Sequence, residues 1–134
     1  MNINLATLPD ITALYTALFL LLMLALAANV VRWRMKAHVS LGDGGNKDLT
    51  AAVRCHGNAA EYVPLVLIGM GLLEMLGASN MAIHLYGGLF LLGRLVHPLG
   101  LSQKKKVNIL RQLGIVISWG VMLVLAIHLL IKLL

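Results

Sequence analysis

The chain has 134 residues, of which 60% are hydrophobic and only 12% are charged, and its formal net charge is +6. A soluble domain carries about a quarter charged residues, so this composition excludes an ordinary soluble protein and indicates an integral membrane protein. The length allows about four spans of roughly 20 residues in a single domain, residues 1–134. The basic residues cluster at the predicted membrane ends, where they attract anionic lipid, so nucleic-acid binding is not expected.

The first predicted span covers residues 11–31, which contain no charged side chain. Pro9 and Asp10 precede it as a typical helix start. The apolar run is longer than a signal-peptide core and has no basic residue before it, so we expect a span that is retained. A basic cluster that contains one tryptophan, at residues 32–36, ends the span at the membrane interface.

The second predicted helix is the polar one. A glycine-rich turn at residues 42–46 precedes it, and Asp48 is its expected N-cap. The helix is predicted from Leu49 to Leu76. The polar and ionisable residues of its first half are Arg54, His56, Asn58 and Glu61.

Two further helices complete the predicted bundle. Ser79 and Asn80 cap a third helix that runs to about Val96, and the basic loop at residues 102–106 follows. The fourth helix is predicted from Val107 to Leu133. The residues with possible chemistry at the ends of these two helices are Arg94, His97 and Arg111.

The charge distribution predicts the orientation in the membrane. Every basic residue except Lys132 falls on the side of the first and third loops. The positive-inside rule therefore places both of these loops in the cytoplasm and both termini outside it. The residues on the basic side are Arg32, Arg34, Lys36, Lys47, Arg54, Arg94, Lys104, Lys105, Lys106 and Arg111.

Arg54, Asn58 and Glu61 form the main candidate site. Their spacing of i, i+4 and i+7 places them on one face of a helix. Such residues are costly in a membrane and usually face a bundle interior or a polar cavity. An arginine suits a ligand carboxylate, a glutamate suits an ammonium and an asparagine suits an amide. The alternative is an internal ion pair, such as Glu61 with Arg32 or Arg94, and both possibilities stay open.

Arg94 and His97 lie three residues apart on the third predicted helix and can form a second, cationic side of the candidate site. For Arg94 the alternative is an arginine that reaches out to lipid phosphate, and for His97 a simple helix-end residue. Arg111 fits either the site or a charge that only sets topology. The histidines form no metal-ligand pair with each other or with the single cysteine, Cys55, so no metal site is expected.

The chain resembles the MAPEG family, the membrane-associated proteins in eicosanoid and glutathione metabolism. The central pattern is R-x-H-x-N-x-x-E-Y-x-P, formed by Arg54, His56, Asn58, Glu61, Tyr62 and Pro64. The segments Val30–Lys36 and Gly93–His97 are similar to the ends of the family's first and third helices. The resemblance covers nearly the whole chain.

The resemblance implies an all-α, four-helix membrane subunit assembled as a homotrimer, with glutathione bound between subunits at the cytoplasmic side. Arg54, Asn58 and Glu61 would then be glutathione ligands, and Tyr62 would line the same pocket. The other ligands implied by the resemblance are Arg32, Arg94 and His97.

One position departs from the family pattern. Several glutathione-using members carry a tyrosine seven residues after the third-helix arginine, and here this residue is Leu101. The thiol of glutathione would therefore ionise beside a cation, for which Arg111 and Arg94 are the candidate catalytic residues.

The resulting prediction is a glutathione transferase or glutathione-dependent peroxidase of bacterial type in the inner membrane. Its second substrates would be apolar electrophiles that enter from the bilayer. The alternative is a non-catalytic MAPEG-like protein that binds a lipid or a protein partner through the same trimer.

Overall fold

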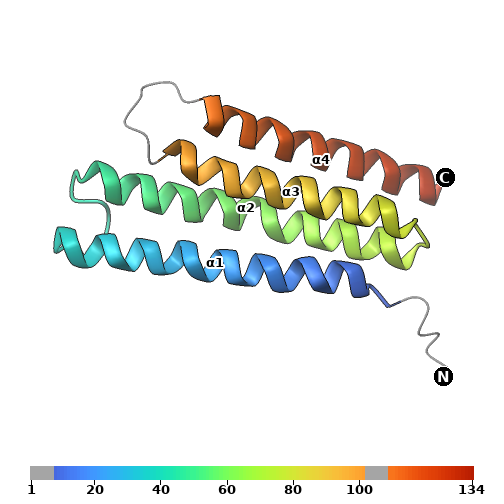
Figure 1. The fold of residues 1–134 in the computed structure, drawn as a ribbon, viewed down its shortest axis with the longest axis horizontal. Coiled ribbons are helices and arrows are strands. Elements are labelled where there is room, and N and C mark those ends of the chain that lie inside the picture. Colours follow the sequence, from blue (N-terminus) through green and yellow to red (C-terminus); the bar gives the residue numbers. More distant parts are fainter. Residues whose placement is uncertain (1–7, 102–108) are drawn as a thin grey trace.

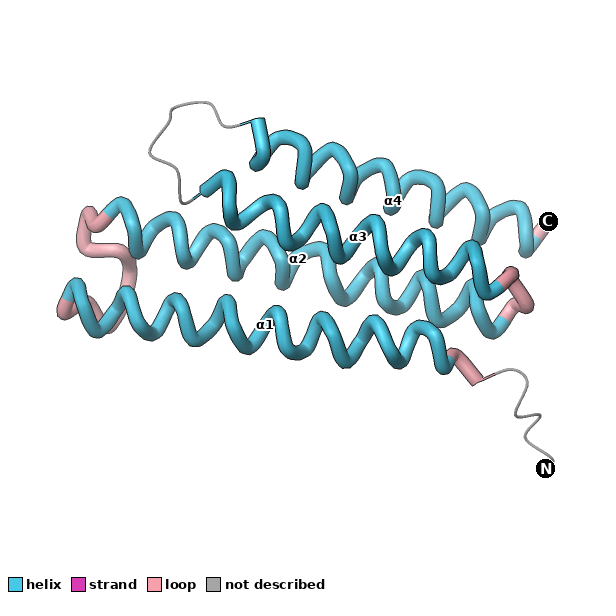
Figure 2. Tube along the Cα trace, in the orientation of Figure 1, coloured by secondary structure: helices cyan, strands magenta, loops and turns pink. Residues whose placement is uncertain are grey.

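The computed structural model describes residues 8–101 and 109–134, which form four long helices in an antiparallel bundle (Figures 1 and 2). The helices are α1 (Asp10–Ala37), α2 (Lys47–Met75), α3 (Asn80–Leu101) and α4 (Ile109–Leu133), and the described residues contain no strand. This confirms the predicted all-α, four-helix architecture. We call the end that holds the α1–α2 loop, the end of α3 and the start of α4 the loop end (Figure 1, left). The start of α1 and the end of α4 lie at the other end, which we call the terminal end.

The boundaries of α1 and α2 differ from the prediction in two places. α1 continues through the basic cluster to Ala37, and His38 ends it in the left-handed conformation with φ 54°. α2 begins at Lys47, and its N-cap is Asn46 rather than Asp48. The Asn46 Oδ1 accepts hydrogen bonds of 3.0 Å from the backbone N–H groups of Asp48 and Leu49. An N-cap side chain must bond the N–H two or three residues ahead, which Asn46 does here.

α3 is longer than predicted. We expected it to end near Val96, before Pro98, but the helix continues to Leu101 with Pro98 inside it. A proline removes one backbone hydrogen bond, and membrane helices tolerate this loss more readily than soluble ones. α4 is described from Ile109, so its predicted start at Val107 lies outside the described residues.

The helices pack most extensively in the pairs α3–α4 and α1–α2. α3 and α4 approach closely at Gly93 and Gly114, where a Cβ added to Gly114 would lie 2.7 Å from the Gly93 carbonyl oxygen. Small residues allow membrane helices to approach in this way. The largest fully buried core side chains are Phe19, Leu49, Val66, Met70, Leu73, Ile83 and Phe90.

The outer surface of the bundle is apolar, as a bilayer requires. Many leucine, isoleucine and valine side chains are exposed on all four helices. By length and composition, α1 and α4 are each sufficient to cross a membrane. At the terminal end, the Glu74 carboxylate accepts hydrogen bonds from the backbone N–H groups of Ile11 at 2.9 Å and Thr12 at 2.8 Å. Because a helix N-terminus carries partial positive charge, this contact fastens the start of α1 to α2.

Candidate functional site

A pocket at the loop end brings together polar residues from three helices. Its volume is about 200 Å³. We call it the polar pocket, and its lining residues are Arg54 and Asn58 from α2, His97 from α3, and Arg111 and Ile115 from α4. The described lining residues include two arginines and no carboxylate, so the pocket favours an anionic ligand.

Arg94 lies behind this pocket and is only 2% exposed. It donates from Nη1 to Asn58 Oδ1 at 2.7 Å, and from Nη2 to Ser118 Oγ at 2.7 Å and to the Gly114 carbonyl at 3.1 Å. No described residue accepts a hydrogen bond from its Nε. Arg94 therefore neither reaches out to lipid phosphate nor, among the described residues, forms an ion pair with Glu61.

The Tyr62 ring packs against Arg94 and does not line the polar pocket. The Arg94 guanidinium carbon lies 5.5 Å from the centre of the Tyr62 ring, within the range of a cation–π contact. The Tyr62 hydroxyl accepts a hydrogen bond of 3.2 Å from Trp119 Nε1. Both contacts fix the ring between α2, α3 and α4.

Glu61 follows Asn58 along the same face of α2, and its side chain is exposed. Within residues 8–101 and 109–134, no group donates a hydrogen bond to its carboxylate or forms an ion pair with it. An ionised carboxylate against lipid is costly, and the described residues supply no partner that would offset this cost.

Arg32 does not line the polar pocket. It is exposed, donates from Nη2 to Asn29 Oδ1 at 3.0 Å, and stacks beside Trp33. It lines a separate pocket of about 230 Å³ where α1 meets α2 and the end of α3. The other lining residues of this pocket are Leu26, Asn29, Trp33, Asp48, Ala51, Ala52, Cys55 and Pro98.

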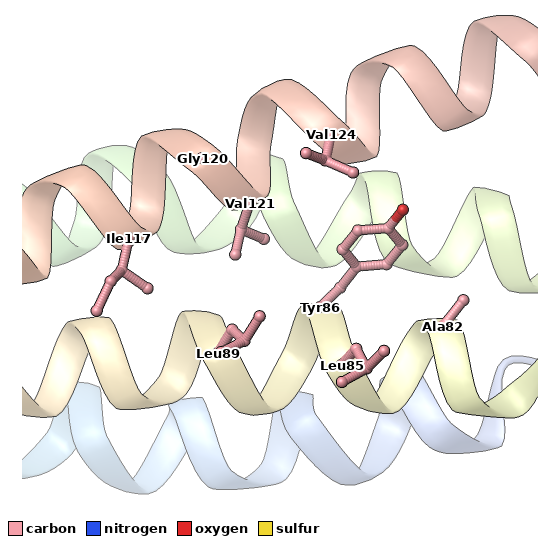
Figure 3. Close-up of a pocket in the computed structure, with 8 residues that line it drawn as sticks. All are labelled: Ala82, Leu85, Tyr86, Leu89, Ile117, Gly120, Val121 and Val124. Carbon is pink, nitrogen blue, oxygen red and sulfur yellow. The ribbon is translucent and has the colours of Figure 1, made fainter.

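Two features were not predicted from the sequence. The first is Ser118, which is 0% exposed and accepts a hydrogen bond from Arg94. The second feature is an apolar pocket of about 440 Å³ between α3 and α4, into which the Tyr86 ring projects (Figure 3). It is lined by Ala82, Leu85, Tyr86, Leu89, Ile117, Gly120, Val121 and Val124. No pattern in the sequence marks these residues as a group, because each is a common residue of a membrane helix.

Leu101, the residue at the family's tyrosine position, is the last residue of α3. Its side chain lies outside the described part of the structure, as do Lys104, Lys105 and Lys106.

The four long helices and their apolar exterior define an α-helical membrane protein. The cationic polar pocket at one end is a candidate ligand-binding site. Residues 12–131 match the profile of the MAPEG family, and the chain belongs to this family. It is 42% identical over 94 residues to the inner membrane protein YecN of Escherichia coli K12, across 70% of this chain and 72% of the relative. YecN of E. coli O6:H1 matches to the same extent. The chain is accordingly an inner membrane protein.

Proposed function

We propose that this protein binds glutathione in the polar pocket and uses it as a co-substrate to conjugate or reduce apolar electrophiles from the bilayer. One observation carries the proposal: Arg54, Asn58, His97 and Arg111 converge in one pocket at the loop end of a MAPEG-family bundle. Glutathione offers two carboxylates, two amides, an ammonium and a thiol. The arginines suit its carboxylates, and Asn58 suits an amide or a carboxylate.

The site on one subunit is too small for the whole ligand. Its volume of about 200 Å³ is below the roughly 300–1,000 Å³ of typical ligand pockets. The exposed Glu61, on the same face of α2, would hold the ligand ammonium once a neighbouring subunit covers it. Arg32 lies outside its own subunit's polar pocket, which fits a contribution to the site of a neighbour. These features support a homotrimer with glutathione between subunits.

Arg111 is the better candidate for activating the thiol. It lines the polar pocket, whereas Arg94 is buried behind it and engaged with Asn58 and Ser118. A positive charge beside the thiol favours the thiolate, which is the nucleophile. In conjugation the thiolate sulfur bonds to the electrophilic carbon, and the leaving group departs with the electrons of the broken bond. In peroxide reduction two glutathione molecules become one disulfide, and the peroxide becomes an alcohol and water.

The apolar pocket favours a second candidate function. Its described lining residues carry no charge, and it lies between two helices within the apolar part of the bundle. A non-catalytic lipid-binding member of the family would use such a pocket without any need for glutathione.

Thermal unfolding of the purified protein in mild detergent separates the two functions. Glutathione that binds only the folded protein raises Tm with increasing concentration. Turnover of 1-chloro-2,4-dinitrobenzene or of a lipid hydroperoxide then tests catalysis. The absence of any Tm shift at millimolar glutathione would overturn the proposal. A Tm shift without turnover of any electrophile would favour the non-catalytic function.

A further inference from the structure

We infer that Arg94 is a positioning residue: it holds the Asn58 amide in one orientation, so that the polar pocket presents the Asn58 Nδ2–H group and selects a ligand acceptor there. The identity of the ligand rests on the proposed function. The orientation itself rests only on the contacts between α2, α3 and α4.

The orientation follows from the chemistry of the guanidinium. An arginine has only donors, so the atom that faces its Nη1 at 2.7 Å must be the amide oxygen of Asn58. The amide nitrogen then occupies the other branch of the side chain. Asn58 lines the polar pocket, and no described residue accepts a hydrogen bond from its Nδ2. The free hydrogen-bonding group of Asn58 is therefore a donor.

Arg94 can impose this orientation because its own position is fixed. The Ser118 hydroxyl donates to the Gly114 carbonyl at 2.7 Å, which leaves its oxygen free to accept from Arg94 Nη2. The guanidinium carbon also lies 5.7 Å from the centre of the Phe90 ring and 5.5 Å from the centre of the Tyr62 ring. A planar guanidinium held on several sides has no alternative placement of similar energy.

Asn58 and Glu61, on one face of α2, therefore recognise different groups of the ligand. At Asn58 the site accepts a carboxylate or an amide carbonyl and rejects an ammonium, because an ammonium offers no acceptor to Nδ2–H. An ammonium fits one turn further along, at the Glu61 carboxylate. The spacing of these two residues therefore fixes the direction in which a zwitterionic peptide ligand lies.

The test compares Asn58→Asp with Ile115→Asp. Asn58→Asp keeps an oxygen for Arg94 but replaces the Nδ2 donor by a second oxygen. Ile115→Asp adds the same charge to the same pocket and leaves Asn58 intact. We expect calorimetric titration to give glutathione affinity about tenfold weaker in Asn58→Asp than in Ile115→Asp, with the Tm of ligand-free Asn58→Asp retained.

Arg94→Lys tests positioning separately from structural support. A lysine keeps the charge but cannot bridge Asn58 and Ser118 with a fixed planar group. We expect the folded fraction of Arg94→Lys to bind glutathione several-fold more weakly. A purely structural Arg94 would lower Tm and leave the affinity of the folded protein unchanged, which would overturn the inference.

The remaining outcomes separate the inference from the proposed function. Equal glutathione affinity in Asn58→Asp and Ile115→Asp would overturn the inference while the proposed function stands. No glutathione binding to the wild type would overturn the proposed function. In that case, side-chain amide hydrogen exchange in the ligand-free protein still decides the orientation. Rapid exchange of the Asn58 Nδ2 protons with water supports the inference, and strong protection overturns it.

Discussion

Arg54 and Glu61 lie on the same face of α2, and both side chains are exposed on the subunit. We expect Arg54→Leu to weaken glutathione binding by about 10- to 100-fold, because a charge-assisted hydrogen bond to a carboxylate is lost. Glu61→Gln should weaken it less, since an amide oxygen still accepts from an ammonium. Titration of the purified variants measures both effects.

Lys132→Leu is the matched control for these two variants. Lys132 is at the terminal end, where its Nζ donates to the Gly77 carbonyl at 3.3 Å. Lys132→Leu lowers the net charge by one, as Arg54→Leu does. Lys132 lies near the end of α4, whereas the polar pocket is near the start of this helix. Equal losses in Lys132→Leu and Arg54→Leu would show that the effect is general electrostatics and not contact with the ligand.

Arg111 should affect rate more than binding. If its charge acts mainly on the developing thiolate, Arg111→Leu lowers kcat for a generic apolar electrophile about tenfold or more, with a smaller change in glutathione affinity. Steady-state kinetics at saturating glutathione, combined with titration, measures the two quantities separately. A variant whose weaker binding accounts for the whole loss of activity would contradict this role.

At the scale of the helices, the contact between α3 and α4 at Gly114 leaves no room for a side chain. A Cβ at Gly114 would lie 2.7 Å from the Gly93 carbonyl oxygen and 2.9 Å from His97 Cβ, and neither the backbone oxygen nor the base of the side chain can move away cheaply. We expect Gly114→Ala to destabilise the protein by about 1–3 kcal/mol, measured as a lower Tm in detergent.

Gly120→Ala provides the comparison on the same helix. A Cβ at Gly120 meets no atom within 4 Å, and alanine favours a helix over glycine by about 1 kcal/mol. The Tm of this variant should be unchanged or slightly higher. If Gly114→Ala were as stable as Gly120→Ala, the close approach of α3 and α4 would not hold in the protein.

The helices were predictable from the sequence because long runs without charge can satisfy their backbone in a membrane only as helices. The shared face of Arg54 and Asn58 was equally predictable, since it depends only on helical periodicity. The burial of Arg94 was not, because it depends on how closely α4 approaches α3 at Gly114. The N-cap at Asn46 was missed because both Asn46 and Asp48 are good capping residues, and only the loop path decides between them.

At the scale of the whole molecule, we expect a homotrimer in which the polar half of α2 faces a neighbouring subunit. The exposed Glu61 carboxylate has no partner among the described residues, and burial against another subunit avoids the cost of exposing it to lipid. Native mass spectrometry in mild detergent should find three copies. A dominant monomer or dimer would contradict the prediction.

The loop end should face the cytoplasm. Of the described lysines and arginines, only Lys132 is at the terminal end, and an excess of arginine and lysine marks the cytoplasmic side. Alkaline phosphatase fused after Leu134 should be active, because this enzyme needs the periplasm. Fluorescence from a fluorescent protein fused at the same position would instead place the C-terminus in the cytoplasm. The polar pocket would then be on the periplasmic side.

The contact of Glu74 with the start of α1 has a consequence for biogenesis. The carboxylate that caps Ile11 N–H lies 63 residues further along the chain, so during synthesis α1 exists before its cap does. The start of α1 acquires this partner only after α2 has been made almost completely. Until then Asp10 Oδ1, at 2.9 Å, is a side-chain acceptor for the Ile11 N–H, whereas the Thr12 N–H still awaits Glu74. The α1–α2 hairpin is therefore the smallest unit in which both of these N–H groups have a side-chain acceptor.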